Sequence, residues 1–323
     1  MIKIAAGIDI GGTNTVWGFI DQSGKVLKKG SFRTQSYHDA DEFVKRLSDD
    51  MLSNLKQFPS FELVGIGIGA PNGNFIKGTI ELPPNLPWKG ITPLKKLFLQ
   101  YFDVPVWITN DANAAATGEM LFGAAKGMKD FIVITLGTGL GSGFVSNGKL
   151  IYGHDAFGGE LGHTIVEIDG RQCGCGRKGC LETYVSASGI VRTAHWMLQD
   201  YKGTTLLNNV DKICSKTIAQ CAENGDPLAL KIFDFTAQKL GFSLANTVAI
   251  TSPEAIILFG GLANAGDLIA QPTKDYMERY LLNLFKNKVK ILRSEVPQDY
   301  AAILGSAALV WKNCVPQITE KEH

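Results

Sequence analysis

The sequence predicts an α/β protein built from two related domains. Segments that read as strands alternate with segments that read as helices along the chain. A length of 323 residues exceeds what a single hydrophobic core usually supports. A glycine-rich hairpin near the N-terminus also recurs in the middle of the chain. Each domain is therefore expected to open with one copy of this hairpin.

The two hairpin copies share residues in their turns and in their second strands. Gly12-Thr13 recurs as Gly137-Thr138, and Gly18-Phe19 recurs as Gly143-Phe144. Each copy reads as an apolar strand, a Gly/Thr turn, a second strand and an Asn/Ser-Gly turn. Such a repeat indicates two similar domains. Chance similarity between two glycine-rich hairpins is the alternative.

Helices and strands alternate after each hairpin. Apolar residues at helical spacing predict a helix over 39–57, and short apolar runs predict strands over 62–69 and 104–109. Residues 70–90 are rich in Pro, Gly and Asn and read as a long loop of the kind that often carries function. A helix over 111–121 follows, capped by Asn110 or Asp111.

The second half continues the same alternation. The sequence predicts helices at 183–200, 212–223, 227–250, 267–284 and 299–312, and strands at 255–259 and 288–293. The expected division is a smaller N-terminal α/β domain of residues 1–115, completed by the C-terminal segment 299–323. The larger α/β domain is expected to span 116–298 and to contain a metal-binding loop at 160–182.

Composition and charge narrow the functional classes. The chain is 45% hydrophobic and 20% charged, as in ordinary soluble globular proteins, with a net charge of +1. Because no long basic run occurs, we do not expect nucleic acid as a partner. No signal peptide or bilayer-length apolar run is evident, so we expect a cytoplasmic protein without a membrane partner. Its cysteines should then stay reduced.

Three clustered cysteines and an upstream histidine predict a structural zinc site. Cys173, Cys175 and Cys180 fall within a short glycine-rich stretch, and His163 precedes them. One His and three Cys form a complete tetrahedral ligand set for zinc. Glu160 and Glu182 bracket this stretch without being needed as ligands, so they are expected to face something else. The alternative is a reduced surface loop with incidental cysteines.

Three glycine turns could bind phosphate. The turns at Gly11–Asn14 and Gly137–Gly139 each follow an apolar strand, and Gly260-Gly261 lies between a strand and a helix. Glycine lets backbone N–H groups approach an anion closely, and the threonine hydroxyls add donors. Taken alone, each such turn is more often a plain turn than a phosphate site. The two related hairpin turns together suggest one nucleotide held between two domains.

Asp111 is the sharpest candidate for a catalytic residue. It lies where a predicted strand ends and a helix begins. Ligands of α/β sheets bind beyond the carboxyl ends of the strands. A carboxylate at this point could accept a proton from an attacking hydroxyl. The alternative is a simple helix N-cap.

Five motifs stand out along the chain: Asp9-x-Gly-Gly-Thr13, Asn110-Asp111-Ala-Asn113-Ala, Leu136-Gly-Thr-Gly-x-Gly141, Gly159-Glu160-x-Gly-His163 and Cys173-x-Cys-Gly-x2-Gly-Cys180-x-Glu182. Together they resemble the ROK family of sugar kinases and related repressors, and the resemblance extends from Asp9 to about Ala308. It implies the two-domain actin/hexokinase-like ATPase fold, with duplicated ribonuclease H-like domains and a zinc-binding loop.

The resemblance also implies roles for individual residues. Asp111 matches the family's catalytic base, and zinc would be held by His163, Cys173, Cys175 and Cys180. Sugar hydroxyls would contact Asn85, Asn110, Asp111, Glu160, His163 and Glu182. ATP with Mg²⁺ would lie against Asp9, Gly11, Gly12, Thr13, Asn14, Thr138 and Gly139, with Gly260 and Gly261 beside the adenosine.

The implied activity is transfer of phosphate from ATP to the primary 6-hydroxyl of a hexose, with glucose favoured. A fructokinase or an N-acetylmannosamine kinase of the same family is the alternative, since the 70–90 loop departs from the family pattern at Gly69–Gly73 and Asn85–Trp88. A sugar-responsive repressor is disfavoured, because a strand that starts by Ile4 leaves no room for a preceding DNA-binding domain. A homodimer or higher homo-oligomer is the expected assembly.

Overall fold

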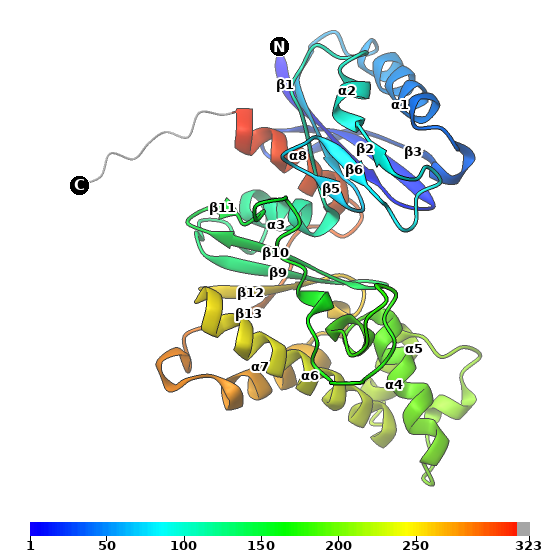
Figure 1. Cartoon of the computed structure of the whole chain (residues 1–323), viewed down its shortest axis with the longest axis vertical. Helices are drawn as coiled ribbons and strands as arrows, with labels where there is room; N and C mark the ends of the chain where they lie inside the picture. The colour runs from blue at the N-terminus through cyan, green and yellow to red at the C-terminus, as the bar shows by residue number, and fades with distance from the viewer. Residues whose placement is uncertain (315–323) are drawn as a thin grey trace. The chain divides into compact units, whose positions relative to one another are not determined.

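The computed structural model describes residues 1–314 and divides the chain into two compact units (Figure 1). Unit 1 contains Met1–Lys126, Tyr152–Gly158 and the segment from Glu295 onward, and unit 2 contains Gly127–Ile151 and Gly159–Ser294. The sequence-based boundary at 115/116 falls inside helix α3 (Asp111–Phe122), which stays whole within unit 1. The part of the predicted C-terminal segment at 315–323 lies outside the described residues.

Each unit is built around a five-stranded sheet, and the two sheets have the same topology. The strand order is β3-β2-β1-β4-β8 in unit 1 and β11-β10-β9-β12-β13 in unit 2. In both, a central strand pairs antiparallel with the next strand of its hairpin and parallel with a later strand. This shared order is what a duplication produces, and it agrees with the two-domain fold expected from the sequence.

The strands of the first sheet are β1 (Ile2–Ile10), β2 (Asn14–Asp21), β3 (Val26–Arg33), β4 (Phe61–Gly69) and β8 (Val106–Thr109). Those of the second are β9 (Phe131–Leu136), β10 (Leu140–Ser146), β11 (Lys149–Leu150), β12 (Ala255–Phe259) and β13 (Lys290–Arg293). The strands predicted at 62–69, 104–109, 255–259 and 288–293 are confirmed as β4, β8, β12 and β13 within a few residues.

Helix α1 (Ala40–Leu55) shows how a predicted helix forms. The Asp39 side chain caps it by accepting hydrogen bonds from the backbone of Asp41 and Glu42, at 2.9 and 3.0 Å. Phe43 and Leu47 lie on its inner face and are fully buried. Burial of each such side chain contributes about 1.5–3 kcal/mol. Capping and burial together define this helix.

Helix α8 (Ala301–Cys314) is packed directly against the first sheet. Its backbone approaches β1 at Gly7 and β4 at Gly67, where a Cβ atom would lie within 2.0 Å of the Ile303 carbonyl oxygen and 1.9 Å of the Ser306 carbonyl oxygen. The α8 side chains between Ile303 and Val310 are buried. The two glycines are therefore required by the close approach of this helix.

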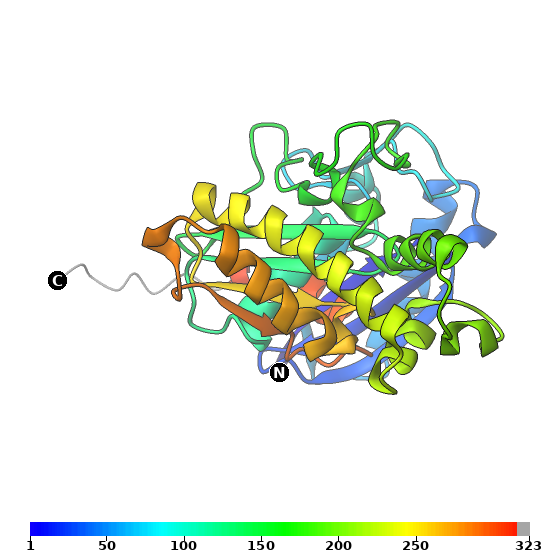
Figure 2. The same ribbon diagram turned by 90° about the horizontal axis from the view of Figure 1, so that it is seen from below.

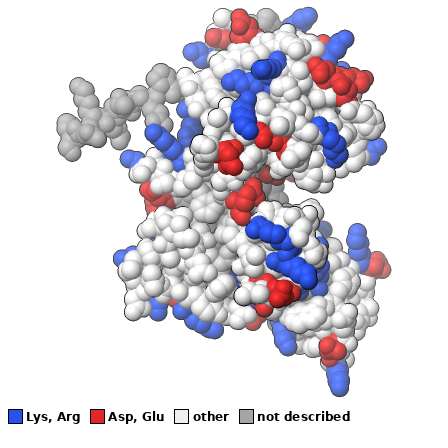
Figure 3. Space-filling view, in the orientation of Figure 1, with Lys and Arg blue, Asp and Glu red and all other residues white. Residues whose placement is uncertain are grey.

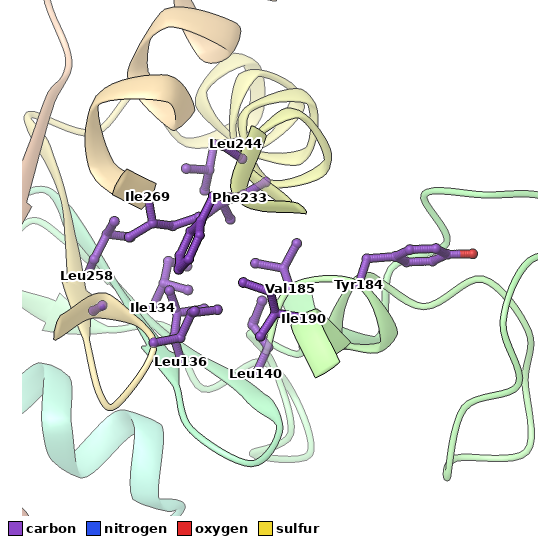
Figure 4. Packing of buried hydrophobic residues seen from close by; sticks show 14 of the residues in the cluster. Ile134, Leu136, Leu140, Tyr184, Val185, Ile190, Phe233, Leu244, Leu258 and Ile269 are labelled. Atoms are coloured by element: carbon purple, nitrogen blue, oxygen red, sulfur yellow. The ribbon is translucent and has the colours of Figure 1, made fainter. Parts of the chain in front are cut away.

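The helices of unit 2 cover its sheet. They are α4 (Ala187–Asp200), α5 (Ser215–Glu223), α6 (Pro227–Thr251) and α7 (Asp267–Tyr280). Figure 2 shows α6 and α7 side by side across one face of the sheet. Asp226 caps α6 and Pro227 occupies its first position, where the missing N–H has no cost. Phe233 and Leu244 of α6 meet Leu136 and Leu258 of the sheet in the core (Figure 4).

The 70–90 segment is more ordered than the sequence predicts. It forms a small sheet of β5 (Gly73–Asn74), β6 (Thr79–Glu81) and β7 (Ile91–Thr92), followed by the short helix α2 (Leu94–Phe98). Ile80, Leu86 and Trp88 are buried in the core of unit 1. Because the segment is rich in Pro and Gly, its sequence does not indicate that these residues are buried. Short 3₁₀ turns occur at Thr34–Ser36, Leu161–His163, Leu181–Thr183, Leu206–Asn209, Ala263–Ala265 and Asn283–Phe285.

None of the helices within residues 1–314 combines the length and the apolar character needed to cross a bilayer.

Replacement of Gly67 by alanine tests the packing of α8. The new methyl group would collide with the Ser306 carbonyl oxygen, so we expect Gly67→Ala to lower the free energy of unfolding by about 1–3 kcal/mol or more. Chemical denaturation would measure this loss. Gly261→Ala, which meets nothing within 4 Å, is the matched control and should stay within about 0.5 kcal/mol of the parent. Equal effects of the two substitutions would contradict the packing argument.

Candidate active site and metal cluster

Two carboxylates lie at the carboxyl edge of the first sheet. Asp9 is the penultimate residue of β1, and Asp111 lies two residues after Thr109, the last residue of β8. Strand β4 lies between these two strands and runs parallel to both. Asp9 Oδ1 lies close enough that a Cβ atom on Gly69, at the end of β4, would be 3.8 Å away. The fold thus gathers the two candidate acids at one edge.

Asp111 is held at the first position of helix α3. Asn110 is the N-cap, and its side-chain oxygen accepts the Asn113 N–H at 2.7 Å. The N-cap role left open by the sequence therefore belongs to Asn110. Asp111 keeps a solvent-exposed face, while Oδ1 accepts the Ala112 N–H at 2.9 Å. Burial raises the pKa of the Asp111 carboxyl, and the Ala112 bond offsets only part of that shift.

Asp9 also has a raised pKa. Burial, together with repulsion from the Asp111 carboxylate, raises its pKa from 3.8 to about 7. Two carboxylates in one desolvated site favour a protonated form of one of them. A cation placed between them would relieve that repulsion. Their oxygen atoms are also the ligands that Mg²⁺ prefers.

The first glycine turn meets the end of the 70–90 segment. The backbone of Gly12 packs against Asn85 so closely that a Cβ atom would lie 2.6 Å from the Asn85 carbonyl oxygen. Asn85 is exposed, whereas Leu86 and Trp88 beside it are buried and fix its position. Thr13 is exposed, as is Asn14 in the same turn. Asn85, which is predicted to bind the sugar, and the turn that is predicted to bind phosphate are thus adjacent in unit 1.

Sequence reasoning missed a strap of residues 152–158 that belongs to unit 1. The Tyr152 ring stacks on Phe75 with centroids 4.3 Å apart, and the Asn74 side-chain amide donates to the Asp155 carbonyl at 2.9 Å. Burial raises the pKa of the Tyr152 hydroxyl, so it stays protonated at neutral pH. The only signal in the sequence was an aromatic residue before a glycine-rich stretch.

Unit 2 gathers the four predicted metal ligands. The ligand atoms of His163, Cys173, Cys175 and Cys180 all lie within 4.8 Å of one another. Cys175 Sγ lies 3.6 Å from Cys180 Sγ, and Cys173 Sγ lies 3.7 Å from His163 Nδ1. A tetrahedral zinc with Zn–S bonds of about 2.3 Å needs S···S separations of about 3.8 Å. The cluster therefore has the donor set and the size of a structural zinc site.

Arginine side chains form hydrogen bonds within the loop that carries this cluster. Figure 3 shows Lys and Arg side chains gathered over loop 160–182 in the lower half of the view. The Arg171 guanidinium donates to the carbonyls of Thr183 and Gly189, at 2.9 and 3.2 Å. Arg177 donates to the carbonyl of His163 at 2.7 Å. These bonds satisfy backbone oxygens that an irregular loop would otherwise leave without partners.

The two glutamates that bracket the cluster differ in their surroundings. Glu160 is exposed at the start of the 3₁₀ turn that carries His163. Glu182 is partly exposed, and its Oε1 lies 3.2 Å from Cys173 Sγ. Its Oε2 accepts the Leu140 N–H at 3.3 Å. Glu182 thus contacts both the cluster and the second glycine turn, which the sequence did not predict.

The remaining glycine turns lie together in unit 2. Thr138 and Gly139 follow β9, and Gly260 follows β12. These strands are parallel neighbours, with Phe259 paired to Thr135. The Leu262 N–H donates to the Leu136 carbonyl at 3.1 Å, which joins the two turns. The exposed Gly261 lies in the same connection.

A protein-family comparison decides the relationship. The family model of the ROK family matches residues 5–313. The chain belongs to the ROK family.

Relatives in the ROK family include enzymes and regulators. A glucokinase from Halalkalibacterium halodurans is 35% identical over 319 residues, which cover 94% of each chain. A xylose repressor from Caldicellulosiruptor bescii is 30% identical over 295 residues, which cover 89% of this chain and 73% of the repressor. The crystal structure of a ROK family glucokinase from Streptomyces griseus, in complex with glucose and AMPPNP, superposes with a TM-score of 0.78 at 33% identity, covering 95% of this chain and 98% of that one.

The raised pKa of Asp9 predicts a pH-dependent effect of Asp9→Asn on stability. The Asp9 carboxyl binds its proton more tightly in the folded protein than in the unfolded chain. Its ionisation therefore does not lower the free energy of unfolding below about pH 4, and it lowers it by the full amount above about pH 7. We expect Asp9→Asn to raise the melting temperature by a few degrees at pH 8 and by much less at pH 5. Calorimetry without nucleotide or added magnesium would measure both values.

Asp21→Asn is the matched control. Burial opposes ionisation of Asp21, but hydrogen bonds from Ser23 and Lys25 outweigh it and lower the pKa of this carboxyl. This substitution should therefore give no gain in melting temperature at pH 8. A gain for Asp9→Asn that is the same at both pH values would show that Asp9 is not destabilised by its charge.

Proposed function

We propose that this ROK-family chain is an ATP-dependent sugar kinase that phosphorylates the 6-hydroxyl of a hexose, with glucose as the favoured substrate. The observation that carries the proposal is Asp111, a carboxylate of raised pKa with an exposed face at the carboxyl edge of the first sheet. Coverage of 94% of both chains in the match to a glucokinase supports the choice of reaction.

Asp111 would act as the general base. The oxygen of the sugar hydroxyl attacks the γ-phosphorus of ATP, the bond from that phosphorus to the bridging oxygen of ADP breaks, and the hydroxyl proton passes to the Asp111 carboxylate. A raised pKa makes this carboxylate a stronger proton acceptor, provided that it remains ionised at the working pH. Asn110, which caps the same helix, and Asn85 would hold neighbouring hydroxyls, together with Glu160 and His163.

The glycine turns would bind the nucleotide. Backbone N–H groups at Gly11, Gly12 and Gly139, with the hydroxyls of Thr13 and Thr138, can donate to phosphate oxygens. Mg²⁺ bound with ATP would neutralise phosphate charge, and Asp9 is the carboxylate placed to hold it or one of its waters. Phosphoryl transfer relies mainly on such positioning and electrostatic stabilisation.

Zinc would be held by the His163 and cysteine cluster. With four protein ligands it has no open position for a substrate and would serve structure. His163 Nδ1 lies 3.7 Å from Cys173 Sγ, and with Nδ1 on the ion Nε2 would remain for a sugar hydroxyl. The ion would fix the orientation of that ring.

The alternative substrates and the regulatory role need a direct test. Phosphorylation of fructose or N-acetylmannosamine would use the same base. The similarity to a xylose repressor at 30% identity makes a sugar-binding regulator the second alternative. A coupled assay with ATP, Mg²⁺ and a panel of glucose, fructose, mannose, allose, N-acetylglucosamine and N-acetylmannosamine would decide. Turnover with none of these sugars, combined with sugar binding, would refute the kinase proposal.

Asp111→Asn should reduce kcat about 10²–10⁴-fold while sugar binding changes little. The amide keeps the size of the side chain but cannot accept the hydroxyl proton. Coupled kinetics and sugar titration would measure the two quantities separately. A variant that retains more than roughly a tenth of the parent rate would exclude Asp111 as the base.

Cys175→Ser should abolish stoichiometric zinc binding. Cys175 is the exposed member of the cluster, so its loss removes a ligand without opening a cavity in the core. Structural zinc contributes on the order of 10 kcal/mol of apparent binding energy, so the loop should also lose stability. Elemental analysis after gel filtration would report zinc content, with Cys221→Ser as a control cysteine outside the cluster. If elemental analysis found no zinc in the purified parent protein, the metal assignment would be refuted.

A further inference from the structure

The segment that follows the last cysteine of the cluster reaches back to the second glycine turn. We call residues 181–188 the exit segment and residues 137–140 the second turn. The Ala187 N–H donates to the Gly137 carbonyl at 2.8 Å, and the Ser188 hydroxyl donates to the Thr138 carbonyl at 2.8 Å. The Leu140 N–H donates to Glu182 at 3.3 Å. Three successive parts of the turn are therefore bonded to one segment.

Glu182 joins the metal cluster to the turn within a single side chain. Oε1 lies 3.2 Å from Cys173 Sγ and 3.9 Å from His163 Nδ1, while Oε2 takes the Leu140 bond. The turn also lies against this carboxylate at Gly139, where a Cβ atom would be 2.6 Å from Oε2. A shift of the cluster that moves Glu182 must therefore disturb the turn.

The exit segment is anchored well enough to transmit such a shift. Leu181 and Val185 are fully buried, and Figure 4 shows Val185 in the same core as Leu136, which precedes the turn, and Leu140, which ends it. Ser186 Oγ donates to the Glu182 carbonyl at 2.8 Å and accepts the Gly189 N–H at 2.9 Å. The connection is thus packed and hydrogen-bonded.

We infer that the zinc loop positions the nucleotide-binding turn as well as the sugar-binding residues, with Glu182 and Ser188 as positioning residues. This inference rests on the proposed function, in which the second turn binds nucleotide phosphates. Glu182 holds the end of the turn at Leu140, and Ser188 holds its centre at Thr138. The loop thereby links zinc occupancy to nucleotide affinity even when no sugar is bound.

Nucleotide affinity measured without sugar tests this role. Calorimetry would compare Mg²⁺ with a non-hydrolysable ATP analogue on zinc-loaded parent protein and on Glu182→Ala. Loss of one such hydrogen bond is worth roughly a 3–10-fold change, so we expect Kd to rise by about that factor. Glu182→Gln should recover most of the affinity, because its amide oxygen can still accept the Leu140 N–H. Glu167→Ala, in the same loop but paired with Lys239, is the control and should bind normally.

Ser188→Ala provides a second variant that should leave folding intact, since Ser188 is exposed. It should also weaken nucleotide binding about 2–10-fold, with zinc content unchanged. If Glu182 contacted only the sugar, each variant would bind the ATP analogue as tightly as the parent protein does when no sugar is present. That result would overturn the inference. Parent protein that binds no nucleotide would instead overturn the proposed function, and this inference with it.

Discussion

The close packing of α8 onto the glycines of the first sheet is the constraint on which unit 1 depends. Gly7 and Gly67 let the helix backbone lie directly on β1 and β4. On its other side, α8 meets α3 at a pair of glycines, where a Cβ atom on Gly118 would lie 3.0 Å from the Gly305 Cα. One helix therefore fixes both the strand that ends near Asp9 and the helix that begins at Asp111.

That packing also explains the electrostatics of the candidate active site. Partial removal of water from the Asp9 and Asp111 carboxyls at this edge raises the pKa of both, while Asp111 keeps an exposed face. The unbound protein therefore bears an unfavourable charge at this edge. A bound cation would lessen that cost, and in the proposed reaction the same desolvation would favour proton transfer to Asp111.

Unit 2 repeats the topology but adds an irregular loop after β11. A loop of this kind has little regular backbone bonding and few apolar anchors, so it needs other sources of order. Arg171 and Arg177 supply bonds to backbone oxygens, and the three cysteines with His163 form a group that could hold a metal ion. Glu182 then connects the loop to the second turn. Leu161 and Leu181, which are buried in the core of unit 2, anchor the two ends of the loop to the sheet.

The sequence by itself predicted the α/β class, the duplication and the grouping of His163 with the three cysteines. Each depends on local signals, namely hydrophobic period, glycine turns and cysteine spacing, which act over a few residues. The ordered structure of residues 70–90 could not be predicted, because the buried residues Leu86 and Trp88 lie among prolines and glycines, which usually indicate a loop.

Only the tertiary structure decided which side chains meet. The repulsion between Asp9 and Asp111 and the contact of Glu182 with Leu140 join residues far apart in the chain. The Tyr152 stack on Phe75 does the same. Such pairs depend on strand order and on helix packing, which a single sequence specifies only through the whole fold.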